Sequence, residues 1–110
     1  MTLGDLIKEL GKADPNRVLP DGFMGPHSYR GDYCDLAFEP KKDVPVGVML
    51  ADARGALGQT YSGYKGGDFL MSEYTPVHLA SYGETGEEIG PLLLRLMLNQ
   101  PAPTTEAADG

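Results

Sequence analysis

The chain has no tryptophan, one cysteine and no long hydrophobic run. Because Cys34 stands alone, no disulfide can form within the chain and no all-cysteine metal site can be built, which favours a reducing compartment. The longest apolar stretch, Leu92 to Leu98, contains Arg95, and it is far shorter than the roughly 20 residues that a membrane-spanning helix needs. Asp5 and Glu9 also make the first residues unlike a signal peptide. We therefore expect a soluble protein that is neither secreted nor bound to a membrane.

Positive charge is scarce. The chain has 9 Lys and Arg against 16 Asp and Glu, a formal charge of −7, which opposes binding to DNA or to anionic membranes. A single phosphate can still be held by a few local cations, because charges act within a Debye length of about 8 Å. The 110 residues, 41% of them hydrophobic, predict one domain with one core, a size that oligomerisation helps to stabilise.

Two segments have apolar residues at helical spacing. They are Leu3, Leu6, Ile7 and Leu10 in the first segment, and Val46, Met49, Leu50, Ala53 and Leu57 in the second. This spacing predicts helices over residues 2–12 and about 44–57. Thr2 is placed to cap the first helix, with Asp5 in its first turn, and Asp43 is placed to cap the second.

Strand signals are shorter. Residues 18–19 and 36–38 predict strands that end at Pro20-Asp21-Gly22 and at Pro40, because proline lacks the N–H that a sheet ladder uses. Alternation in 69–71 and in 77–82 predicts an antiparallel hairpin. The apolar run 92–98 fits a buried strand or a short helix, of which we favour the strand.

The last ten residues, 101–110, combine proline, threonine and small or acidic residues. Such a segment buries too little apolar surface to offset the entropy of ordering, so it is predicted to be disordered. No repeat and no second domain are evident. The sequence predicts a small α+β domain with an antiparallel sheet of four or five strands, two helices and a disordered C-terminal tail.

Two seven-residue segments, 27–33 and 61–67, combine tyrosines, glycines and one cation each. Arginine pairs bidentately with phosphate, tyrosine stacks on a base, and glycine lets backbone N–H groups approach an anion. The alternative is a surface arginine, core tyrosines and a glycine-rich bend. No P-loop pattern is present. The candidate ligand-binding residues are Ser28, Tyr29, Arg30, Gly31, Tyr33, Tyr64, Lys65, Gly66 and Gly67.

Catalytic and metal-binding patterns are missing. His27 and His78 have no metal-ligand spacing around them, and neither HExxH nor GxSxG occurs. His78 is interpreted as a partly exposed sheet residue, and Cys34 as a buried small residue, because only Arg30 is near enough in sequence to activate the thiol. We expect no metal, no cofactor and no enzymatic activity.

Five segments in order resemble small phage proteins of the first Thoeris anti-defence sponge type. They are His27 to Tyr33, Leu36 to Glu39, Tyr64 to Phe69, Thr75 to Val77 and Tyr82-Gly83. The resemblance implies an α+β protein that sequesters a cyclic ADP-ribose isomer, the alarm signal of a TIR-domain enzyme, without cleaving it. It also implies dimers with pockets near the subunit boundary, assembly into hexamers, and cyclic oligonucleotides at separate sites in some members.

By the same resemblance, the protein would act in the cytoplasm of the infected bacterial host. Arg30 and Lys65 would face phosphates, and Tyr29, Tyr33 or Tyr64 would stack on the adenine. Two alternatives stay open. One is an acidic phage protein that inhibits a host factor by protein–protein contact, and the other is a small cyclic-nucleotide hydrolase that uses one of the histidines.

Overall fold

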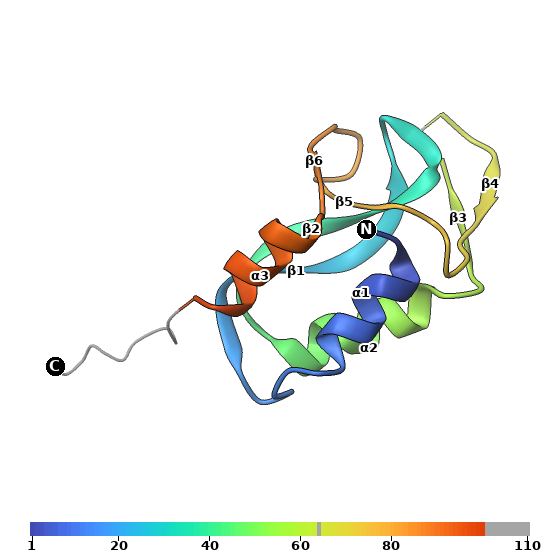
Figure 1. The fold of residues 1–110 in the computed structure, drawn as a ribbon. Helices are drawn as coiled ribbons and strands as arrows, with labels where there is room; N and C mark the ends of the chain where they lie inside the picture. Colours follow the sequence, from blue (N-terminus) through green and yellow to red (C-terminus); the bar gives the residue numbers. More distant parts are fainter. Residues whose placement is uncertain (64, 101–110) are drawn as a thin grey trace, which may run out of the picture.

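The computed structural model describes residues 1–63 and 65–100, so Tyr64 and the predicted disordered tail, 101–110, lie outside the described residues. Along the chain, the elements are α1 (Leu3–Leu10), β1 (Val18–Tyr29), β2 (Asp32–Pro45), α2 (Val46–Ala56), β3 (Thr60–Ser62), β4 (Asp68–Leu70), β5 (Val77–Leu79), β6 (Glu87–Glu88) and α3 (Pro91–Leu98) (Figure 1). The expected α+β class is confirmed.

The main sheet has the strand order β1-β2-β5-β6, and β3 pairs with β4 in a separate two-stranded sheet. β1 and β2 form a long antiparallel hairpin, whereas β5 lies parallel to β2. The sheet is therefore mixed, not wholly antiparallel. The predicted hairpin between 69–71 and 77–82 is wrong, because β4 pairs with β3 and β5 pairs with β2 and β6. Short alternating runs predict a strand but do not determine its partner.

Both strands of the long hairpin continue through a proline that was expected to end them. Pro20 lies in β1, which is an edge strand of the sheet, and an edge position tolerates the missing N–H. Pro40 lies in β2 beyond Phe38, the last residue that β5 pairs with. On that side Pro40 therefore faces no partner strand.

The first two helices form where they were predicted, over Leu3–Leu10 and Val46–Ala56, but only the cap of the first is as expected. Thr2 caps α1, and its hydroxyl accepts the Asp5 N–H at 3.2 Å while Asp5 Oδ2 accepts the Thr2 N–H at 3.2 Å. These two bonds lower the pKa of Asp5 below its ordinary value of 3.8. The predicted Asp43 cap of α2 is wrong, because Pro45 occupies the N-cap position and Asp43 has a left-handed φ of 56°.

The run 92–98 is helix α3, so the favoured strand was wrong. Pro91 stands in the first turn, where its fixed φ suits a helix and its missing N–H costs nothing, and leucine is a good helix former. Leu94 and Met97, three residues apart, are buried, whereas Leu92 and Leu96 remain exposed. Only the packing shows which face of this apolar run points inward.

The main core lies on one face of the sheet, where α1 packs on α2 and α2 packs on β1 (Figure 1). In β2, Leu36 and Phe38 belong to this core. Ala37 belongs to a separate small cluster with Tyr29 and Ala80, as expected when successive side chains point to opposite faces of a strand. In the described part of the chain, no helix is long and apolar enough to cross a membrane.

Candidate functional site

The segments 27–33 and 61–67 meet at Tyr33. Its ring centroid lies 5.8 Å from that of Phe69. A Cβ placed on Gly63 would lie 3.0 Å from Tyr33 Cδ2 and 2.9 Å from Phe69 Cε2. Arg30 Nη1 makes a long contact of 3.5 Å with the Tyr33 hydroxyl. The turn between β1 and β2 therefore packs against the glycine-rich loop, with Tyr33 between them.

Arg30 lines an open depression of about 500 Å³ together with Gly83, Glu84 and Thr85. These three residues belong to the loop between β5 and β6, which contributes none of the candidate residues chosen from the sequence. Lys65 is exposed and is not among the described residues that line this depression. The surface beside Arg30 therefore comes from a different loop than the one expected.

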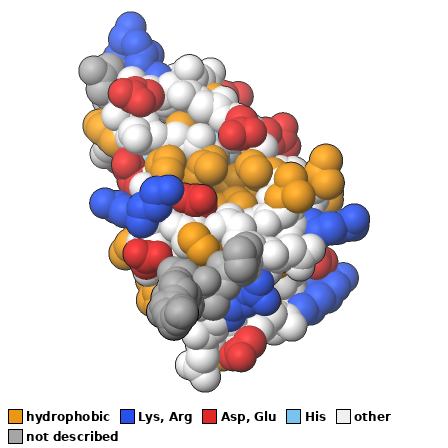
Figure 2. All heavy atoms as spheres, turned by 90° about the vertical axis from the view of Figure 1, so that its left-hand side faces the viewer, with side chains coloured by type: hydrophobic (Ala, Val, Ile, Leu, Met, Phe, Trp, Pro, Cys, Tyr) orange, Lys and Arg blue, Asp and Glu red, His pale blue; other side chains and the backbone are white. Residues whose placement is uncertain are grey.

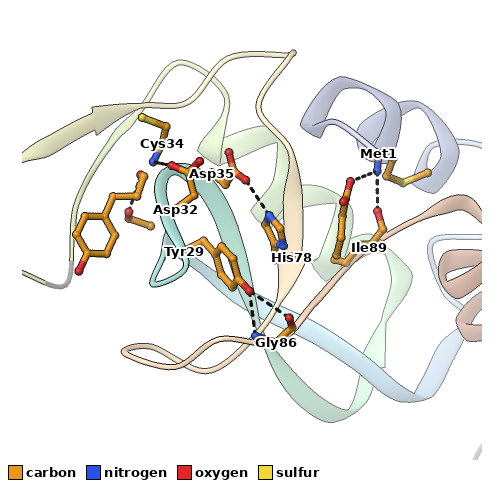
Figure 3. Close-up of polar contacts among 11 residues, drawn as sticks. Met1, Tyr29, Asp32, Cys34, Asp35, His78, Gly86 and Ile89 are labelled. Atoms are coloured by element: carbon orange, nitrogen blue, oxygen red, sulfur yellow. Dashed lines mark hydrogen bonds and ion pairs between the residues drawn. The ribbon is translucent and has the colours of Figure 1, made fainter.

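Tyr29 is mostly buried, with 8% of its surface exposed. Its ring lies parallel to the imidazole of His78, with centroids 3.8 Å apart and an angle of 4° between the planes. Its hydroxyl donates to the Gly86 carbonyl and accepts the Gly86 N–H, both at 3.1 Å (Figure 3). These contacts bury the Tyr29 ring and occupy its hydroxyl, so Tyr29 is poorly placed to stack on a bound base.

Gly31 has a different role from the one expected. A Cβ at this position would lie 2.6 Å from Tyr29 Cε2 and 3.0 Å from Tyr29 Cζ, whereas carbon atoms normally approach to about 3.5–4.0 Å. The missing side chain therefore makes room for the Tyr29 ring. Ser28 is also engaged internally, because its hydroxyl donates to the Tyr33 carbonyl at 2.7 Å.

The glycine-rich loop closes on itself. The Gly63 N–H donates to the Gly67 carbonyl at 2.8 Å, and the Gly66 N–H donates to the Gly63 carbonyl at 2.9 Å. Gly66 and Gly67 both have positive φ, 102° and 86°, which glycine adopts without steric cost. Because the turn itself uses the Gly66 N–H, the anion-binding nest suggested by the sequence has one donor fewer.

Sequence reasoning missed a polar cluster on the face of the sheet opposite the main core. His27 and His78 both register with Ala37, one from each side. His78 Nε2 lies 2.9 Å from Asp35 Oδ2 (Figure 3), and His27 Nδ1 lies 3.1 Å from the Gly25 carbonyl and 3.6 Å from Glu39 Oε2.

The signal that could have revealed this cluster is the alternation in β2. Asp35, Ala37 and Glu39 alternate there with the core residues Leu36 and Phe38. Period-two alternation of this kind puts the two acids on one face. His78, expected to be a partly exposed sheet residue, has only 13% of its side chain exposed.

The contacts of His78 are with an acid and an aromatic ring. His78 contacts a carboxylate and a stacked phenol ring, and neither is an alcohol or thiol nucleophile that it would activate. Cys34, expected to be buried, is exposed instead, and its backbone N–H donates to Asp32 Oδ1 at 3.0 Å. Among the described residues, no group of three His, Cys, Asp or Glu side chains is placed to hold a metal ion.

Comparison of this chain with protein-family models, with curated proteins and with solved structures gives no match. What this surface can bind therefore follows from its own side chains.

Proposed function

We propose that the protein binds a small phosphorylated nucleotide of the cyclic ADP-ribose class and holds it without cleaving it. The observation that best supports the proposal is the depression that Arg30 lines with Glu84 and Thr85, beside the half-buried ring of Tyr33. Guanidinium groups pair bidentately with phosphate, and carboxylates accept hydrogen bonds from ribose hydroxyls. An arginine and an acid side by side suit a ribose phosphate better than a bare anion, which Glu84 would repel.

Tyr33 is the aromatic ring best placed to stack on a base. It contacts Arg30 and belongs to the surface where two loops meet, whereas Tyr29 is committed to His78. Stacking on an aromatic side chain contributes roughly 1–3 kcal/mol, and each charge-assisted hydrogen bond about 1.5–3 kcal/mol. Two or three such bonds and one stacked ring suffice for tight binding if the site is preformed. Lys65, on the adjoining loop, remains the candidate for a second cation.

We also propose that the protein self-associates through α3, in line with the dimers that the resemblance implies. Leu92 and Leu96 are 66% and 60% exposed, and a groove of about 520 Å³ runs along this helix, lined by Leu93, Leu96 and Met97 among others. Figure 2, which views the molecule from the α3 end, shows hydrophobic side chains gathered in a band.

Charged side chains lie at both ends of α3. Glu87 and Glu88 precede the start of the helix. Lys42 lies beside its end, because it pairs with Asp21, whose backbone binds the side chain of Gln100. Because Lys42 is already paired with Asp21 and Glu88 with the N-terminal ammonium, the apolar side chains of α3 carry the proposed contact. In a two-fold symmetric interface the same patch of each subunit faces the other.

Calorimetry against a panel of cyclic ADP-ribose isomers and cyclic oligonucleotides tests the proposed function. We expect at least one isomer to bind and to be recovered intact by chromatography after the protein is denatured by heat. A new chromatographic peak would indicate a hydrolase and overturn the proposal. Failure of every member of the panel to bind would overturn it in favour of a protein that acts through protein–protein contact.

A further inference from the structure

The loop of residues 81–86 joins β5 to β6 and supplies every residue that lines the Arg30 depression except Arg30 itself. Side chains from the long hairpin hold its two ends. At one end, the Tyr82 N–H donates to Glu39 Oε2 at 2.6 Å. At the other, the Tyr29 hydroxyl bonds to both backbone groups of Gly86. The position of the loop relative to Arg30 therefore depends on these two side chains.

Each of the two holding side chains lies next to a histidine. The Tyr29 ring is stacked on His78, which Asp35 orients at 2.9 Å. Glu39 lies 3.6 Å from His27 Nδ1. The packed Tyr29 ring has lost its rotamer freedom before the hydroxyl binds Gly86, so its hydrogen bonds to the loop cost little further ordering.

The Gly86 end of the loop is also closely packed. A Cβ on Gly86 would lie 2.1 Å from the Leu79 carbonyl oxygen and 2.9 Å from Ala80 Cβ, so the loop lies directly against β5 at this point. The Tyr29 hydroxyl also binds Gly86 at this point (Figure 3). Glu84 and Thr85, which directly precede Gly86, are therefore attached to a backbone position that is well defined.

We propose that Tyr29 and Glu39 are positioning residues that hold the loop 81–86 in the arrangement that binds the ligand, an inference that rests on the proposed function. Neither residue needs to touch the ligand. They act because a loop that is already ordered does not have to be ordered by the ligand, and that cost would otherwise weaken binding. The residues the sequence suggested as direct contacts thus include one, Tyr29, that acts through the loop.

Tyr29→Phe is the most selective test, because it removes the hydroxyl and keeps the ring stacked on His78. We expect hydrogen exchange at Gly86 and its neighbours in the loop to accelerate by at least about 5-fold, because two hydrogen bonds are lost. The affinity for cyclic ADP-ribose, measured by calorimetry, should fall by a similar factor. Tyr74→Phe is the matched control, since Tyr74 is 76% exposed, and it should change neither quantity.

A second pair of variants tests the other end of the loop. Glu39→Gln keeps an oxygen that accepts the Tyr82 N–H, and it should retain most of the affinity, whereas Glu39→Ala should lose about 5-fold. Equal losses in both Glu39 variants would overturn the positioning role and point to a role for the charge itself.

The outcomes separate this inference from the proposed function. If the unmodified protein binds none of the cyclic nucleotides, the proposed function fails, while hydrogen exchange still shows whether Tyr29 holds the loop. Unchanged exchange in Tyr29→Phe would overturn the inference even if the ligand binds. Faster exchange with unchanged affinity would overturn it as well, because the loop would then move without consequence for the ligand.

Discussion

Replacing Gly31 by alanine tests whether this glycine leaves room for the Tyr29 ring or for a bound ligand. The new Cβ would lie 2.6 Å from Tyr29 Cε2, 3.0 Å from Cζ and 3.2 Å from the hydroxyl oxygen. Relieving the first contact requires the ring to move by about 1 Å, because carbon atoms pack at about 3.5–4.0 Å. Such a movement disturbs both the stack on His78 and the two bonds to Gly86. Overpacking of this kind typically costs about 1–3 kcal/mol.

Thermal unfolding followed by circular dichroism measures this cost. For a domain of this size, each 1 kcal/mol shifts Tm by about 4–8 °C, so Gly31→Ala should lower Tm by at least about 4 °C. Gly55→Ala is the matched control: Gly55 lies in α2 and a Cβ there would meet nothing within 4 Å. It should raise the stability by about 0.5–1 kcal/mol, because alanine is the better helix former.

Two outcomes would contradict the argument that Gly31 makes room for the Tyr29 ring. If Gly31→Ala unfolds at the same temperature as the unmodified protein but no longer binds the nucleotide, the space above Gly31 belongs to the ligand and not to Tyr29. Equal effects of both substitutions would also contradict the argument, since the two sites differ in the room that they offer.

Three further outcomes are expected. Arg30→Ala should weaken binding of the nucleotide by about 1–3 kcal/mol and Arg30→Lys by less, since lysine keeps the charge but not the bidentate geometry; calorimetry measures both. Leu92→Glu combined with Leu96→Glu should shift the protein to a smaller species in sedimentation, because two charges would enter an apolar contact. Asp5→Asn should make the free energy of unfolding depend less steeply on pH in the acid range. The pKa of Asp5 is lowered in the fold, so its contribution is present above pH 3.8 and is lost as the pH falls through the folded-state pKa.

Each of these outcomes has a counterpart that would contradict it. Unchanged affinity in Arg30→Ala would remove the phosphate site, and a loss of affinity in Lys65→Ala alone would move that site to the glycine-rich loop. An unchanged sedimentation coefficient would show that the α3 surface does not hold two copies together. An equally steep dependence in Asp5→Asn would assign the pH dependence to other carboxylates.

Several local features followed directly from the sequence. The cap at Thr2 with Asp5 was correct because its hydrogen bonds join residues three apart, so no distant residue enters the argument. The segments 27–33 and 61–67 were singled out by their composition, and the approach of Gly63 to Tyr33 shows where they meet.

Features that depend on a partner strand or on the burial of one face could not be predicted. Pro20 and Pro40 were expected to end strands, yet each stands where no ladder hydrogen bond is needed, a fact that the strand order decides. The run 92–98 is apolar except for Arg95, so its periodicity does not distinguish a helix from a strand. The pairing of β5 with β2 likewise joins residues some forty positions apart.

Local chemistry therefore settled the α+β class, the first helix, the acidic surface and the two tyrosine- and glycine-rich segments, since each depends on neighbours within a turn or two of chain. Tertiary packing decided which side chains of those segments face inward. Tyr29 was drawn into the interior by His78 and Gly86, which lie far away in the chain, and the surface beside Arg30 was completed by the loop between β5 and β6.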